Sequence, residues 1–174
     1  MLKSEEILDI VKEKGTILDD KDAQLERYKQ WIYFYRLNID LFCEDVLGIK
    51  LKPFQKSMLL EMADGEVVDI VASRGLSKTF ITALFAIIMC LLYSCQEVLV
   101  VSFTLSQSNG LIEDKIMKEF CDPKNGLSPV LQQLVKDGWI TFKKDQNTNA
   151  RIVEFANNSK IYASVCGEST RGNN

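Results

Sequence analysis

Residues Asp69 to Phe80 have the sequence "DIVASRGLSKTF". A β-branched segment leads through a short polar loop into a Lys-Thr pair that opens a long apolar run. This is the setting of the phosphate-binding loop G-x-x-x-x-G-K-S/T. Here Ala72 and Ser77 stand where that pattern has its two glycines, while Lys78 and Thr79 are kept. The stretch predicts a variant phosphate loop; the alternative is an ordinary strand-to-helix turn with a solvent-facing lysine.

The flanking residues predict a strand, a helix and a second strand around this loop. "VVDIVAS", residues 67–73, has the β-branched composition of a strand. "FITALFAIIMCLLY", residues 80–93, is apolar nearly all round, which is typical of a helix buried in a core. "EVLVVSF", residues 97–103, predicts another apolar strand. Such strands joined by a long helix indicate a mostly parallel α/β sheet covered on both faces, with ligands at its carboxyl edge.

The region before this unit is predicted to be mainly helical, and the region after it to contain both helices and strands. Residues 4 to about 37 predict helix, with an apolar face that includes Tyr28, Trp31 and Tyr35; this face packs on its own domain or docks a partner. Gly48 and Pro53 interrupt two short helices in residues 38–65. Downstream, two further helices are expected in residues 106–120 and 129–138, and three short strands in residues 139–144, 150–155 and 160–165. The last two strands are joined by the turn signal "ANNS".

Composition excludes several classes of protein. The 174 residues suit one full core; a hydrophobic share of 47% and a charged share of 26% are those of a globular protein. A net charge of −3 argues against a protein that coats DNA through an overall positive charge. The sequence contains no histidine, which excludes catalytic or metal sites that use an imidazole of this chain. The five cysteines show no C-x-x-C spacing and predict reduced, mostly buried thiols. The longest apolar run, fourteen residues, falls short of the ~20 that span a bilayer, and no signal peptide is indicated.

The loop residues have the chemistry that a triphosphate requires. Such a ligand needs converging backbone N–H groups, a helix amino terminus, a lysine and a hydroxyl for magnesium. Lys78 and Thr79 supply the last two, Gly75 keeps the backbone adaptable, and the Ser77 hydroxyl can bond a phosphate oxygen.

The loop "ASRGLSKT" resembles the Walker A loop of the large terminase subunits of tailed bacteriophages, ATPases that pump DNA into capsids. In that family the loop carries an arginine near its start and often departs from the two-glycine rule; Arg74 takes that place here. The resemblance implies that the nucleotide contacts come from Ala72, Ser73, Arg74, Gly75, Leu76, Ser77, Lys78 and Thr79.

Three other segments resemble motifs of the same family in the same order. "LGIKLKPFQKSMLLEM" is similar to its adenine-recognition segment, which implies base contacts by Phe54 and Gln55, whose amide can both donate to and accept from adenine. Gln107 stands where the family commonly has a glutamine. The turn at residues 157–159 and "STRG" at residues 169–172 resemble its hairpin and S/T-x-R-G segment.

This resemblance implies an ATP site in which Lys78 binds the β and γ phosphates, Thr79 holds Mg²⁺ and Arg74 stabilises developing charge. It divides the chain into a helical segment, residues 1–40, and a partial P-loop ATPase domain, residues 41–174, without the Walker B acids or the nuclease domain. We expect an amino-terminal piece that binds nucleotide and hydrolyses it weakly. The family implies double-stranded DNA, the small terminase subunit and the portal protein as partners, a homo-oligomeric ring, and the host cytoplasm.

Two other interpretations stay open. A helicase of the related superfamily also has an aromatic-Gln segment and a phosphate loop, although its loop usually keeps the second glycine. A non-catalytic remnant or assembly module could instead bind a capsid or terminase component through the aromatic N-terminal helix. Binding of a fluorescent ATP analogue, and its loss in Lys78→Ala, separates the motor fragment from the assembly module.

Overall fold

The structure is a computed structural model that describes residues 21–166. The predicted helix start at Ser4 and the segment 169–172 lie outside the described residues. The chain divides into two compact units between Phe34 and Tyr35, and each unit is described by itself. The first unit contributes most of helix α2, Lys21–Leu37. All elements that follow belong to the second unit.

The second unit is α/β, as predicted, with a four-stranded sheet in the order β1-β4-β3-β2. The strands are β1 (Glu97–Ser102), β2 (Ile140–Lys144), β3 (Arg151–Phe155) and β4 (Lys160–Val165). Only β1 and β4 pair in parallel, while β3 pairs antiparallel with both β4 and β2. The expectation of a mostly parallel sheet is therefore wrong. A short turn can join only antiparallel neighbours, so the predicted hairpin itself makes the sheet mixed.

The helices of the second unit agree with the sequence in place and length. They are α3 (Ile39–Leu41), η1 (Phe42–Val46), α4 (Pro53–Asp64), α5 (Lys78–Leu92), α6 (Leu105–Gly110), η2 (Leu111–Phe120) and α7 (Pro129–Lys136). The two predicted interruptions are confirmed: Gly48 has a φ of 70°, and Pro53 is the first residue of α4. Segments η1 and η2 are π-helical and continue α3 and α6 without a break.

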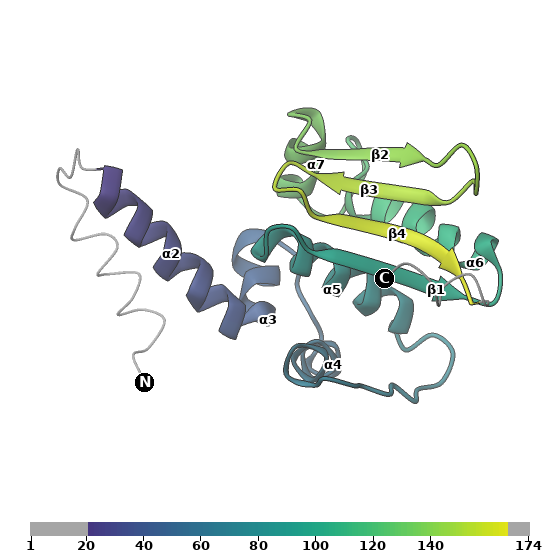
Figure 1. The fold of residues 1–174 in the computed structure, drawn as a ribbon. Helices are drawn as coiled ribbons and strands as arrows, with labels where there is room; N and C mark the ends of the chain where they lie inside the picture. The colour runs from purple at the N-terminus through teal and green to yellow at the C-terminus, as the bar shows by residue number, and fades with distance from the viewer. Residues whose placement is uncertain (1–20, 167–174) are drawn as a thin grey trace. The chain divides into compact units, whose positions relative to one another are not determined.

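Helix α5 is the centre of the core, as its apolar sequence predicts. Eight of its residues are buried, and it packs against η2, β4 and β1. Helices α5, α6 and α7 lie on one face of the sheet (Figure 1), whereas on the other face Leu99 and Val101 stay 44% and 45% exposed. The expected covering of both faces is therefore not seen in the described part of this unit. None of the helices described between residues 21 and 166 is long and apolar enough to cross a membrane.

The strand predicted at residues 67–73 does not form. This segment is extended but unpaired, and Val67 and Val71 are 93% and 91% exposed. The sheet ends at β1, and no described strand runs beside residues 67–73. A strand is stabilised by its cross-strand neighbours rather than by its own composition, so β-branched residues without a neighbour stay irregular. Residues 72–79, predicted to form a phosphate loop, are thus preceded by an extended segment and not by a strand.

The predicted turn between β3 and β4 is confirmed, and it also holds the carboxyl end of α5. The Asn157 side-chain amide donates to the carbonyls of Cys90 and Tyr93, at 2.7 and 3.3 Å. The Ser159 hydroxyl donates to Tyr93 at 2.8 Å and accepts from the Gln96 N–H at 3.1 Å. The last carbonyls of a helix have no partner within the helix, so the turn satisfies groups that would otherwise be unpaired. The hairpin and α5 are thereby fixed to one another.

Candidate functional site

The loop Ala72–Ser77 leads directly into α5 and contains two residues with positive φ. Gly75 has a φ of 87° and Ser77 a φ of 55°, both in the left-handed region. Ser77 precedes the first residue of α5, and its side chain makes no capping hydrogen bond. The first N–H groups of a helix have no partner within the helix. The amino terminus of α5 therefore presents free N–H groups and the positive end of a fifteen-residue helix dipole to this loop.

The Lys78 side chain lies inside the loop. Its ammonium donates to the backbone carbonyls of Ala72 and of Ser73, the second at 2.8 Å. The sequence alone was also compatible with a lysine that faces solvent. In the structure, the Lys78 ammonium is instead bonded to the backbone of the loop. Because carbonyl oxygens and phosphate oxygens are both acceptors of an ammonium, a phosphate entering the loop can take over these two contacts. These two hydrogen bonds connect the start of the loop to the first residue of α5.

The other two residues expected to act on phosphate are exposed. Thr79 is the second residue of α5 and Arg74 lies at the turn of the loop, both open to solvent. A hydroxyl at this place is within the first helical turn, beside the free N–H groups, and is chemically suited to a magnesium ion. No group of three or more acidic or cysteine side chains placed to hold a metal occurs within residues 21–166.

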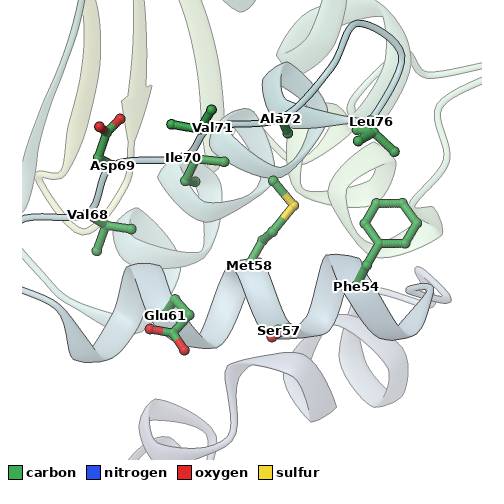
Figure 2. A pocket seen from close by; sticks show the side chains of 10 residues that line it. All are labelled: Phe54, Ser57, Met58, Glu61, Val68, Asp69, Ile70, Val71, Ala72 and Leu76. Carbon is green, nitrogen blue, oxygen red and sulfur yellow. The ribbon is translucent and has the colours of Figure 1, made fainter.

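A cavity of about 660 Å³ adjoins the loop between α4 and the extended segment before α5. Figure 2 shows Phe54 of α4 below Leu76, and Met58 pointing from α4 toward Ala72. The Phe54 ring is 39% exposed, so it offers an open aromatic face. The cavity is lined by Phe54, Ser57, Met58, Glu61, Val68, Asp69, Ile70, Val71, Ala72 and Leu76. An aromatic and apolar wall of this kind is suited to a flat apolar group such as a nucleobase.

Gln55, the other expected base contact, does not line this cavity. Its side chain is 8% exposed, and its Oε1 accepts from the Lys52 N–H at 2.9 Å. The structure therefore brings Phe54, Ala72 and Leu76 together and places Gln55 elsewhere. The sequence analysis missed Met58 and Glu61, although their spacing of four and seven residues from Phe54 puts all three on one helical face.

Gln107 lies in the first turn of α6 and is exposed. Near it, a chain of hydroxyls that the sequence analysis did not single out links the carboxyl ends of the two parallel strands. The Ser108 hydroxyl is 2.6 Å from that of Ser102 and donates to the Ser164 carbonyl at 2.6 Å. Ser108 is buried, so its bonds hold α6 against β1 and β4.

The five thiols are free, as expected, and they differ in environment. Burial raises the pKa of Cys43, Cys90 and Cys121 to about 12, whereas Cys95 and Cys166 are exposed. A thiol that stays protonated is a poor nucleophile and a poor metal ligand. The buried cysteines are therefore core residues.

No protein-family model matches the chain, and no curated protein matches it.

Proposed function

We propose that the loop Ala72–Thr79 binds the phosphates of a nucleoside triphosphate. The observation that carries this proposal is the Lys78 ammonium, which lies within the loop on two backbone carbonyls beside an uncapped helix amino terminus. A lysine ammonium beside the free N–H groups of a helix amino terminus is suited to bind an anion.

The nucleotide of the proposal is ATP with Mg²⁺, and the protein is the ATP-binding part of a DNA-packaging ATPase of the phage terminase type. In this proposal Lys78 binds the terminal phosphates, the N–H groups of Ser77 and Lys78 surround them, and the Thr79 hydroxyl holds the metal. Magnesium neutralises phosphate charge when it is bound. Arg74, exposed on the loop, is free to turn toward the γ-phosphate. The order of the four quoted motifs supports the assignment to this class.

Titration with a fluorescent ATP analogue tests this function. We expect saturable binding by the wild-type chain and a loss of at least about tenfold in affinity for Lys78→Ala, since a hydrogen bond to a charged group contributes ~1.5–3 kcal/mol. Lys136→Ala, which removes an exposed lysine from α7, is the matched control and should bind like the wild type. Equal binding by Lys78→Ala and wild type, with both proteins folded by circular dichroism, would refute the proposal.

A module for assembly with other proteins is a second candidate, and one observation favours it. On the face of the sheet away from α5, α6 and α7, Leu99 and Val101 are half-exposed. Leu99 is in register with Tyr162 of β4, which is in turn in register with Ile152 of β3. Exposed apolar side chains on a sheet face are suited to a partner protein. A folded chain that binds no nucleotide but associates with a capsid or terminase component would favour this candidate.

A further inference from the structure

The outer edge of β1 is an open strand edge. Strand β1 is the last strand of the sheet, and its one neighbour among the described strands is β4 (Figure 1). The carbonyls of Gln96 and Ser102 accept from N–H groups of β4 and the residue after it, at 2.8 and 2.9 Å. Backbone groups alternate in direction along a strand, so the peptide groups of Leu99 and Val101 point to the open side.

This edge also lacks the features that commonly protect an edge strand from pairing. Such features are a lysine, a proline or a bulge within the strand. The sequence of β1, "EVLVVS", contains no lysine or proline, and its register with β4 runs unbroken over six residues. Glu97, at its first position, carries the one charge of the strand. The edge of β1 is therefore ready to accept another strand.

A second extended segment without a partner lies before the loop. Residues 67–71, "VVDIV", make no hydrogen bond to another residue in the part of the chain that the structure describes. Four of these five residues are β-branched, and Val67 and Val71 are 93% and 91% exposed. The segment has the composition of a strand and lacks only a neighbouring strand.

The segment and the edge match in length and in the alternation of their side chains. The segment has five residues and β1 has six. If residues 67–71 paired with β1, Val67 and Val71 would lie beside the half-exposed Leu99 and Val101. Asp69 alternates with its neighbours onto the same side as Val67, which leaves its carboxylate in water on the open face of the sheet. Within one copy of the chain these two segments are not paired, whereas a second copy carries both.

We infer that two copies of this chain exchange strands, with residues 67–71 of each copy pairing with the open edge of β1 in the other. Each copy donates one strand and accepts one, so the exchange closes as a dimer with twofold symmetry. The dimer satisfies the free backbone groups of both segments and covers the apolar side chains beside them. The inference does not depend on a bound nucleotide, and it is tested without one.

Sedimentation equilibrium over a range of protein concentrations tests the inference. We expect the wild-type chain to dimerise. Val71→Lys alters the donated strand and Leu99→Lys the accepting edge, and each should weaken the dimer by at least about tenfold, because lysine on a strand edge opposes pairing. Leu127→Lys is the matched control, since Leu127 is 49% exposed in the loop before α7, and it should dimerise like the wild type.

Circular dichroism shows whether each variant is folded. Because Val67 and Val101 are exposed on the same two segments, Val67→Lys and Val101→Lys replace any variant that does not fold. A wild-type chain that stays monomeric up to about 100 µM would overturn the inference. Dimers that persist in both lysine variants, or a mass that keeps rising beyond the dimer, would overturn it as well.

Mixing the two variants distinguishes strand exchange from pairing of one β1 edge with another. The Val71→Lys chain keeps an intact edge and the Leu99→Lys chain keeps an intact donated segment, so together they can form one of the two strand pairs. We expect tagged Val71→Lys chains to retain untagged Leu99→Lys chains, although each variant alone is monomeric. Two folded variants that also fail to associate with each other would overturn the exchange.

Discussion

Replacing Asn157 should destabilise the fold more than any other change in the turn between β3 and β4. Its side chain makes three hydrogen bonds: two donated to the carbonyls of Cys90 and Tyr93, at 2.7 and 3.3 Å, and one accepted from the Ser159 N–H at 3.0 Å. A net contribution of ~0.5–1.5 kcal/mol for each bond gives a loss of about 2–3 kcal/mol for Asn157→Ala, since the longest bond contributes least. The Cys90 carbonyl, at the end of a buried helix, is then left without this partner.

Urea unfolding followed by circular dichroism measures this loss. Asn157→Asp keeps the acceptor for Ser159 but places a carboxylate against two carbonyls at the negative end of α5, so its loss should exceed that of Asn157→Ala. Asn147→Ala is the control, because Asn147 is exposed in the β2–β3 turn, and it should stay within about 0.5 kcal/mol of wild type. A loss below about 0.5 kcal/mol for Asn157→Ala would show that the turn does not hold α5, and would refute the reasoning.

Three further results are expected. Ser77→Gly should raise the unfolding free energy by about 0.5–1 kcal/mol, because a φ of 55° is strained for serine but not for glycine; a decrease would contradict the left-handed assignment. Ellman's reagent should modify two thiols of the native protein, those of Cys95 and Cys166, and all five only after unfolding. Stability should fall above pH 9, because the three buried thiols with a pKa of about 12 stay protonated in the folded state while the unfolded chain releases their protons. The slope should approach ~1.4 kcal/mol per pH unit for each buried thiol, and Cys121→Ala should reduce it by about a third.

Local patterns in the sequence were sufficient to predict most elements. The apolar run from Phe80 to Tyr93 predicted the buried helix α5, and alternation with an Asn-rich turn predicted the hairpin of β3 and β4. In these elements the signal lies within one segment, so propensity, periodicity and turn chemistry agree.

The segment 67–73 shows a structural feature that local sequence patterns do not predict. Its composition favours a strand as strongly as that of β1, yet β1 has β4 beside it and residues 67–73 have no described strand beside them. Propensity tells which residues fit a sheet, but the neighbour that completes the hydrogen bonds is chosen by tertiary structure. The contact of Asn157 with the end of α5 is long-range in the same way, since it joins residues more than sixty positions apart.

Gln55 is a different case, because the sequence did contain the signal that places it. Pro53 at the first helical position puts Gln55 at the third, where a glutamine bonds back to the cap residue. The resemblance to an adenine-recognition segment pointed to the base instead. The burial of Gln55 and its bond to Lys52 favour the local explanation.

The position of Lys78 is also what makes the binding experiment decisive between a phosphate loop and an ordinary turn. In the structure its ammonium holds the loop through two carbonyls, so Lys78→Ala removes bonds even without a ligand. If holding the loop were its whole role, the variant would lose about 1–3 kcal/mol of stability and no specific affinity for nucleotide. A phosphate that takes over the ammonium gains a charge-assisted bond stronger than the bonds to the carbonyls. A loss of affinity by Lys78→Ala therefore reports the phosphate contact when the unfolding free energy of the variant matches that of the wild type, because a lysine that only anchored the loop would show its loss in the unfolding free energy.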